Sequence, residues 1–202
     1  LKRRRVVVVG GGDIARRKVA SLLGTEARII VVAPSLVSEL EELVSEGSIT
    51  CFKRDYREGD CTGARLVVAA TSSPKVNSSV LREARRQGAY TVACDCCRSS
   101  ASFPASLRRG DLVFSVATSG KVPSLAKHLK QRLALHFGRE WAEVAELLSE
   151  LRRRLKTRKF SLERERRIWR GIFEGAALEH LLQGKRREFE KEVEKCISSS
   201  WG

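Results

Sequence analysis

The sequence predicts an α/β fold in which a doubly wound parallel sheet is followed by a helical C-terminal part. Two observations carry this prediction. In the first half of the chain, short runs of Val, Ile and Leu alternate with amphipathic stretches, and after Thr118 the strand patterns stop. Runs that are apolar throughout are typical of parallel strands covered on both faces, and their alternation with helical patterns indicates right-handed crossovers.

The individual elements follow from these patterns. We expect strands at residues 6–9, 27–32, 49–54, 66–70, 90–94 and 112–118, with helices at 15–23, 35–46 and 76–87. Pro123 occupies a favoured first-turn position and begins a further helix, and residues 139–156 form the next one. The tail, residues 157–202, is predicted to be helical with breaks near Gly171 and Gly184.

Composition and charge limit the classes of protein to consider. Hydrophobic residues make up 42% of the 202 residues, which is enough for a core. No apolar run approaches the roughly 20 residues that cross a bilayer, so we expect a cytoplasmic protein without a membrane partner. The six cysteines are expected to be reduced thiols in that compartment. The net charge of +15 favours polyanions, either nucleic acid or a small molecule with several carboxylates.

A glycine-rich loop follows the first expected strand, in the stretch "VVVVGGGDIA". It has the form Gly10-x-Gly12-x-x-Ala15 between a strand and a helix, which is the context in which this motif binds a dinucleotide. Gly10 permits the tight turn, Gly12 lets the backbone approach a pyrophosphate, and Ala15 lets the helix pack on the strand. We expect the free N–H groups at the helix start, at Asp13 and Ile14, to face the anion.

The second expected strand departs from the usual dinucleotide-binding pattern. It ends in "VVAPS" and lacks the acidic residue that commonly holds the ribose hydroxyls. Ser35 or the backbone of Ala33 and Pro34 would have to take that role. The local chemistry therefore leaves both NAD and NADP open.

A hydroxyl-rich loop, "AATSSPKVN", follows the fourth expected strand. Ligands of open α/β sheets bind at the carboxyl ends of the strands. We therefore add Thr71, Ser72 and Asn77 to the expected cofactor site.

Several segments together resemble one family. The stretches "VVVVGGGDIARRKVASLL", "VVAP", "LVVAATSSPKVN" and "FPASLRRGDLVFSVATSGKVPSLAKHLKQRL" occur in the same order and spacing as in precorrin-2 dehydrogenases. These proteins form the N-terminal module of siroheme synthases and also exist as stand-alone enzymes. The resemblance extends from residue 3 to about residue 155.

The resemblance implies an NAD-binding Rossmann domain at residues 1–113, a dimerisation and substrate region at 114–156 and a helical tail at 157–202. It implies an interlocked homodimer that uses NAD to dehydrogenate precorrin-2 to sirohydrochlorin, in the biosynthesis of siroheme or a related tetrapyrrole. Some relatives also insert ferrous iron, and the resemblance leaves this second activity open. The acetate and propionate groups of such a tetrapyrrole would explain the basic charge of the chain.

The resemblance also implies a catalytic aspartate at the end of the fifth strand. In "TVACDCCRSSASFPA", alignment from the preceding "GAYTV" assigns this role to Asp95, whereas alignment backward from "FPA" assigns it to Cys94. We favour Asp95, because a loop absorbs a deletion more easily than a buried strand. A carboxylate there would accept a proton during dehydrogenation or metal insertion. Cys96 and Cys97 are adjacent and lack C-x-x-C spacing, so we predict small buried residues and no metal site, with a transient role in handling iron left open.

Basic and hydroxyl side chains near the expected substrate site are candidate partners for the carboxylates of the tetrapyrrole. They are Arg109, Thr118, Ser119, Lys121 and Lys127. A non-catalytic module that binds NAD or a tetrapyrrole is the alternative interpretation, since the loop at Asp95 is shortened. Nucleic-acid binding is not favoured, because the charge is not accompanied by aromatic platforms or a recognisable motif.

Overall fold

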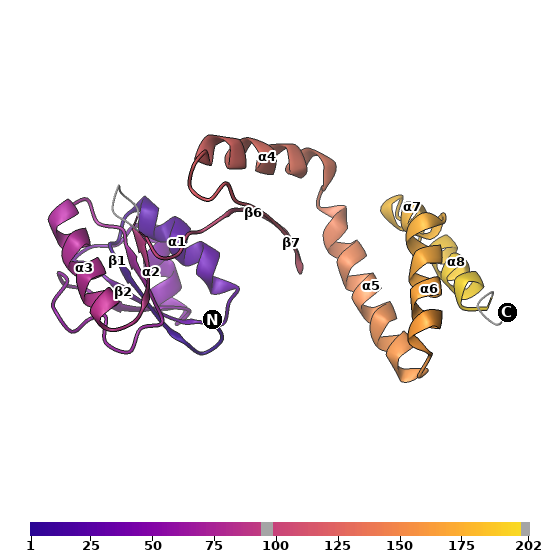
Figure 1. Cartoon of the computed structure of the whole chain (residues 1–202), viewed down its shortest axis with the longest axis horizontal. Coiled ribbons are helices and arrows are strands. Elements are labelled where there is room, and N and C mark those ends of the chain that lie inside the picture. Colours follow the sequence, from indigo (N-terminus) through magenta and orange to yellow (C-terminus); the bar gives the residue numbers. More distant parts are fainter. Residues whose placement is uncertain (94–98, 199–202) are drawn as a thin grey trace. The chain divides into compact units, whose positions relative to one another are not determined.

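The computed structural model describes residues 1–93 and 99–198, and the chain forms two compact units, Leu1–Phe103 and Pro104–Gly202. The first unit contains a parallel sheet with the strand order β3-β2-β1-β4-β5. Figure 1 labels β1 and β2 of this sheet and the three helices of the unit. Its strands are β1 (Arg5–Val9), β2 (Arg28–Val32), β3 (Thr50–Phe52), β4 (Leu66–Ala69) and β5 (Tyr90–Ala93). Its helices are α1 (Asp13–Leu23), α2 (Ser38–Ser45) and α3 (Pro74–Arg86).

The valines of β1 explain why this strand is apolar throughout. Val6 and Val8 pack in one core cluster with residues of α1 and α2, and Val7 and Val9 pack in a second cluster with residues of α3. Successive side chains of a strand point to opposite faces, so a sheet covered on both faces buries every one of them. All four valines are at most 1% exposed. The predicted doubly wound α/β architecture is confirmed.

The order of the strands reverses between β1 and β4. The chain runs from β1 to β2 and β3 on one side of the sheet, and then returns to place β4 on the other side of β1. Open α/β sheets bind ligands outside the carboxyl ends of the strands at such a reversal. The glycine loop follows β1 and the hydroxyl-rich loop follows β4, so the topology brings both loops to this point.

The second unit joins a two-stranded antiparallel sheet to a set of helices. The strands are β6 (Ala105–Arg109) and β7 (Leu112–Val116), and α4 (Pro123–His136) packs on both. The remaining helices share one hydrophobic core and are α5 (Glu140–Thr157), α6 (Leu162–Glu174), α7 (Ala177–Leu182) and α8 (Arg186–Ser198). The helical C-terminal part is therefore confirmed.

Two local features differ from the predictions. The strand β6 was not expected, because "ASLRR" is mostly polar; it forms by pairing with β7 across a turn at Gly110, whose φ is +56°. The break expected near Gly171 lies a few residues later, because α6 continues to Glu174 and α7 begins at Ala177. A Cβ at Gly171 would lie 2.8 Å from Cys196 Sγ, so this glycine permits close packing of α6 on α8.

The helix break near Gly184, the boundary between the units and the absence of a membrane-spanning segment were also expected from the sequence. The break near Gly184 is confirmed, and this residue has a φ of +71° between α7 and α8. The two units meet between Phe103 and Pro104, ahead of the boundary expected at residue 113, and the three-domain division stays a prediction. Among the described helices, none has the length and apolar character needed to span a membrane.

Candidate dinucleotide-binding site

The glycine loop follows β1 and passes very close to neighbouring backbone. Gly10 has a φ of +125°, and a Cβ there would lie 2.3 Å from the carbonyl oxygen of Ala70. A Cβ at Gly11 would lie 1.9 Å from the carbonyl oxygen of Ser35. Both positions therefore exclude any side chain. At Gly12, by contrast, a Cβ would meet nothing within 4 Å.

Helix α1 begins directly after this loop with glycine at its N-cap. Gly12 has an extended backbone conformation, and its carbonyl accepts the first helical hydrogen bond from the N–H of Arg16 at 3.0 Å. A helix leaves its first N–H groups without intrahelical acceptors, and its dipole favours an anion at this end. Because glycine has no side chain to cap them, these N–H groups can serve a phosphate.

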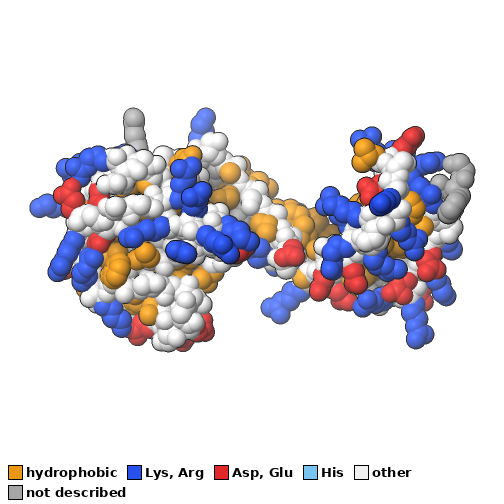
Figure 2. Space-filling model, turned by 90° about the horizontal axis from the view of Figure 1, so that it is seen from below, with side chains coloured by type: hydrophobic (Ala, Val, Ile, Leu, Met, Phe, Trp, Pro, Cys, Tyr) orange, Lys and Arg blue, Asp and Glu red, His pale blue; other side chains and the backbone are white. Residues whose placement is uncertain are grey.

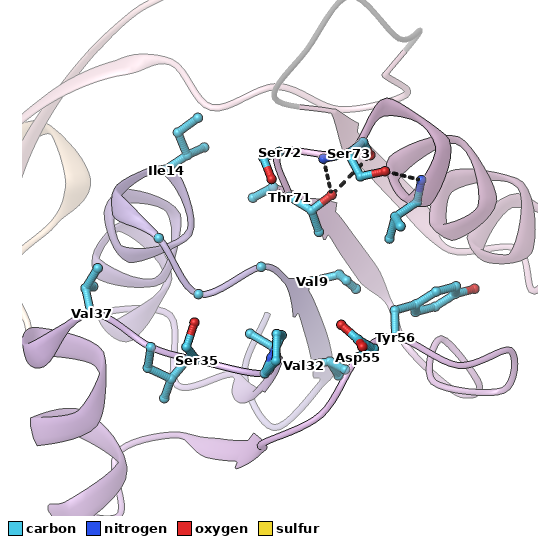
Figure 3. A pocket seen from close by; sticks show the side chains of 18 of the residues that line it. Val9, Ile14, Val32, Ser35, Val37, Asp55, Tyr56, Thr71, Ser72 and Ser73 are labelled. Carbon is cyan, nitrogen blue, oxygen red and sulfur yellow. Dashed lines mark hydrogen bonds between the residues drawn. The ribbon is translucent and has the colours of Figure 1, made fainter.

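A cavity of about 620 Å³ lies at the carboxyl ends of β1, β2 and β4 (Figure 3). Its lining combines the glycine loop, the segment after β2, the segment after β3 and the loop after β4. The predicted cofactor residues that line it are Gly10, Gly12, Asp13, Ile14, Ala33, Pro34, Ser35, Thr71 and Ser72. The structure therefore brings together residues from three separate sequence segments.

Two of the predicted cofactor residues lie beside the cavity lining and not in it. Ala15 is fully buried in the core beneath α1, which agrees with its expected role in packing this helix on the sheet. Asn77 is 2% exposed in α3, and its side chain binds the loop after β4. Direct contact between Asn77 and a cofactor stays a prediction.

Asn77 determines the shape of the hydroxyl-rich loop. Its Oδ1 accepts hydrogen bonds from the backbone N–H of Thr71 at 3.1 Å and from the Thr71 hydroxyl at 2.8 Å. Its Nδ2 donates to the carbonyl of Thr71 at 3.0 Å. The N–H of Ser73 donates to Thr71 Oγ1 at 3.2 Å, as Figure 3 shows. The loop that borders the cavity is therefore held by a buried side chain of α3.

The segment after β3 also lines the cavity, which the sequence analysis did not predict. Asp55 and Tyr56 both contribute to the lining. The sequence contained a signal, because these residues follow an expected strand at the same edge of the sheet as the glycine loop.

Tyr56 is held by a buried glutamate of α3. The Tyr56 hydroxyl donates to Glu83 Oε2, and Glu83 Oε1 accepts from the N–H groups of Gly59 and Cys61 at 3.1 and 3.0 Å. Desolvation, together with the hydrogen bond to Glu83, raises the pKa of Tyr56. Burial likewise raises the pKa of the Cys61 thiol to about 12, so this cysteine is a neutral core residue at physiological pH.

An ion pair closes the loop behind Asp55. The Arg54 guanidinium donates to both carboxylate oxygens of Asp60, at 2.7 and 2.8 Å. The N–H of Arg57 also donates to this carboxylate at 2.8 Å. The Arg54 hydrogen bonds hold the pKa of Asp60 below its usual value, so the carboxylate is ionised at neutral pH. Arg54 is thereby directed to Asp60 and does not line the cavity.

The predicted substrate residues lie in the second unit, on the β6–β7 hairpin and around the start of α4. Arg109 Nε donates to the carbonyls of Phe137 and Gly138 at 2.9 Å, next to the end of α4. Thr118 Oγ1 accepts from the N–H of Val122 at 3.2 Å.

The other three substrate candidates stand near the N-terminus of α4. Ser119 has a φ of +51° in the turn before the helix, and Lys121 and Lys127 are exposed. Figure 2 shows Lys and Arg side chains spread over one face of each unit. Their role in binding a polycarboxylate stays a prediction.

Asp95, the predicted catalytic residue, and the neighbouring Cys94, Cys96 and Cys97 lie outside the described residues. Within residues 1–93 and 99–198, no group of three or more His, Cys, Asp or Glu side chains is arranged to hold a metal ion. The role of Asp95 therefore stays a prediction.

The glycine loop, the uncapped helix start and the cavity at the strand reversal define a dinucleotide-binding protein of the Rossmann class. A family model described as putative NAD(P)-binding matches residues 1–105, and a model described as the sirohaem synthase dimerisation region matches residues 140–197. The chain belongs to this NAD(P)-binding family, in the group that also carries the sirohaem synthase dimerisation region and includes the precorrin-2 dehydrogenases.

Individual relatives agree with this assignment. The chain is 35% identical to a siroheme synthase of Pseudomonas aeruginosa over 199 residues, which cover 98% of the chain and 43% of the relative. It is 35% identical to the siroheme synthase of Azotobacter vinelandii over 201 residues, with 99% and 43% coverage. The chain thus spans less than half the length of these relatives. A solved structure of SirC, a precorrin-2 dehydrogenase, superimposes with a TM-score of 0.80 at 28% identity, covering 96% of both chains.

The described residues fit a dinucleotide. The cavity volume lies within the roughly 300–1,000 Å³ typical of small-molecule sites. The space beside Gly12 is open, and any side chain at this position would fill it. Because glycine leaves this space free, the backbone can approach a phosphate there. The hydroxyls of Ser35, Thr71 and Ser72 and the carboxylates of Asp13 and Asp55 add polar groups to a lining that also contains apolar side chains.

Proposed function

We propose that this chain is an NAD-dependent oxidoreductase that dehydrogenates precorrin-2 to sirohydrochlorin. The observation that carries the proposal is the combination of a dinucleotide cavity in the first unit with the family's dimerisation region in the second. The fold of a precorrin-2 dehydrogenase over 96% of both chains supports the same reaction. NAD, when bound, supplies the hydride acceptor.

In this proposal the residues of the chain position the cofactor and move a proton. The N–H groups at the start of α1 bind the pyrophosphate, and the close packing at Gly10 and Gly11 holds the loop in place. Asp95 accepts the proton that the substrate loses as its hydride is removed. Lys121 and Lys127 bind carboxylates of the tetrapyrrole, and the net charge of +15 raises its local concentration. The chain acts as a homodimer.

The test is an absorbance assay with precorrin-2 and NAD, in which NADH and sirohydrochlorin are expected to form together. Asp95→Asn is expected to lower the rate by on the order of 10²–10⁴-fold, the usual contribution of a general base. Asp111→Asn, which changes an exposed turn carboxylate in the same way, is the control and should retain the wild-type rate. Equal rates for both variants would remove Asp95 from the mechanism.

Two further arms of this assay separate the remaining alternatives. Binding of NAD and sirohydrochlorin without any turnover of precorrin-2 would identify a non-catalytic binding module. Addition of ferrous iron after sirohydrochlorin has formed tests for chelatase activity, because iron insertion changes the absorbance of the macrocycle. In that reaction ferrous iron is a substrate, and the tetrapyrrole nitrogens supply its ligands.

A further inference from the structure

The charged side chains that line the dinucleotide cavity are of one sign. Among the described residues they are Asp13 and Asp55, and no Lys or Arg contributes to the lining. The ribose 2′-phosphate of NADP is commonly held by an arginine at this kind of site, whereas the 2′-hydroxyl of NAD is held by an acidic residue. The lining therefore suits NAD.

The two carboxylates differ in their surroundings. Asp13 stands in the first turn of α1, and its Oδ1 accepts a hydrogen bond from Arg16 Nε at 3.2 Å. For the Asp55 carboxylate, the described part of the chain offers no hydrogen bond or ion pair. Figure 3 shows the Asp55 side chain beside Val32, directed into the cavity. Asp55 is thus the acidic side chain of the lining whose carboxylate has no partner among the described residues.

The turn after β3 explains how Asp55 reaches the end of β2. The carbonyl of Phe52, the last residue of β3, accepts from the N–H of Ala33 at 3.2 Å and from the N–H of Arg54 at 2.8 Å. The chain therefore turns directly after the strand, and Asp55 lines the same cavity as the segment that follows β2. This is the segment in which the sequence lacks the expected acid.

The neighbouring cation is unavailable to a phosphate. Arg54 precedes Asp55, but both of its terminal nitrogens bind Asp60, and one of them also donates to the Asp55 carbonyl at 3.0 Å. A phosphate near Asp55 would therefore meet a carboxylate without a compensating positive side chain. Like charges placed against each other across a binding interface are unfavourable.

We propose that Asp55 replaces the missing acidic residue of β2: its carboxylate accepts a hydrogen bond from a ribose hydroxyl of the adenosine half and selects NAD over NADP. This inference rests on the proposed use of a nicotinamide dinucleotide by the chain. It assigns the choice between NAD and NADP to a residue after the third strand, whereas the usual dinucleotide-binding motif ends with the acidic residue after the second strand.

The test is direct titration of the full chain with NAD and with NADP, followed by calorimetry. Asp55→Asn keeps the size of the side chain and removes its charge. We expect its NAD affinity to fall about tenfold or more, which is the usual effect of losing a hydrogen bond to a charged group. We expect its ratio of NADP to NAD affinity to rise by at least as much. Wild-type values for both quantities in Asp55→Asn would overturn the inference.

Glu58→Gln provides the matched control. Glu58 lies on the same loop and pairs with Arg86, outside the cavity lining. Its NAD and NADP affinities should equal those of the wild type, and a loss as large as that of Asp55→Asn would overturn the inference. Thermal unfolding of all variants verifies folding. If Asp55→Asn does not fold, Asp55→Glu retains the charge and is expected to retain preference for NAD.

A third ligand separates the two donors that the adenosine half presents. Nicotinamide hypoxanthine dinucleotide lacks the exocyclic amine of adenine and keeps the ribose hydroxyls. We expect Asp55→Asn to weaken its binding as much as it weakens NAD binding. If Asp55→Asn weakens the binding of NAD but not of this analogue, Asp55 contacts the adenine amine, and the assignment to a ribose hydroxyl is overturned.

The outcomes also separate this inference from the proposed function. If wild-type protein does not bind NAD, both fail. If it binds NAD and does not convert precorrin-2, the proposed reaction fails, and the comparison of Asp55→Asn with Glu58→Gln still decides the role of Asp55.

Discussion

Asn77 and Thr71 are joined by two backbone-directed hydrogen bonds: the Asn77 Oδ1 accepts from the Thr71 N–H at 3.1 Å, and the Asn77 Nδ2 donates to the Thr71 carbonyl at 3.0 Å. This arrangement fixes the loop after β4 from beneath, with a side chain that is 2% exposed. Thr71 and Ser72 are thereby presented to the cavity from a rigid support.

Asn77→Ala is expected to lower the free energy of unfolding by about 1–3 kcal/mol, since it leaves the polar groups of Thr71 without their buried partner. NAD affinity should fall as well, because the loop at the cavity loses its support. Denaturant unfolding and NAD titration measure the two effects. Lys75→Ala, an exposed change in the first turn of the same helix, is the control, and equal stabilities of the two variants would contradict this role of Asn77.

Substitutions of Gly11 and Gly12 are expected to affect different properties of the protein: the first its stability, the second its affinity for NAD. Gly11→Ala places a Cβ 1.9 Å from the Ser35 carbonyl oxygen, so the backbone must shift, and we expect a loss of about 1–3 kcal/mol in stability. Gly12→Ala meets nothing within 4 Å, so its loss of stability should be smaller than that of Gly11→Ala and limited to the poorer N-cap that alanine makes. Its NAD affinity should still fall roughly tenfold, because the added methyl occupies space that the pyrophosphate needs. Wild-type NAD binding by a stable Gly12→Ala protein would argue against pyrophosphate binding at this loop.

Tyr56 is expected to resist ionisation in the folded protein. Its pKa is raised, first by desolvation and then by the hydrogen bond to Glu83, above the value of about 10 for an unfolded chain. The neutral hydroxyl therefore contributes its full stability below pH 10, and the contribution falls above it as unfolding releases the proton. Tyrosinate absorbance measured against pH should show a step in the native protein that Tyr56→Phe leaves unchanged. A smaller native step in Tyr56→Phe would show that Tyr56 ionises while folded.

The ion pair of Arg54 and Asp60 predicts a loss of stability in acid. The pKa of Asp60 is lowered, chiefly by the hydrogen bonds from Arg54, so its contribution is fully present above the unfolded value of about 3.9. It is lost as pH falls through the lower value of the folded state. The Tm of Asp60→Asn should therefore lie below that of the wild type at pH 7, with the difference shrinking below pH 4. A difference that does not depend on pH would exclude the charge as its origin.

Much of the first unit was predictable from its sequence. The strands of the sheet are buried on both faces, so the continuous apolar runs of β1 and β4 predict buried parallel strands. The glycine loop was also predictable, because few sequences satisfy the close approach at Gly10 and Gly11. The second unit was less predictable from its sequence. The strand β6 depends on pairing with β7, and Gly171 lies within α6, where Cys196 packs close to it.

For the candidate site, the sequence by itself determined the residues that follow β1, β2 and β4, because each carries a local motif at the end of a strand. Only the tertiary structure decided that Asp55 joins them and that Asn77 supports the loop from below. The physical reason is that these two roles depend on contacts across the sheet. The turn at Phe52 aims one side chain into the cavity, and the packing of α3 buries the other. A pattern of residues along the chain does not contain either contact.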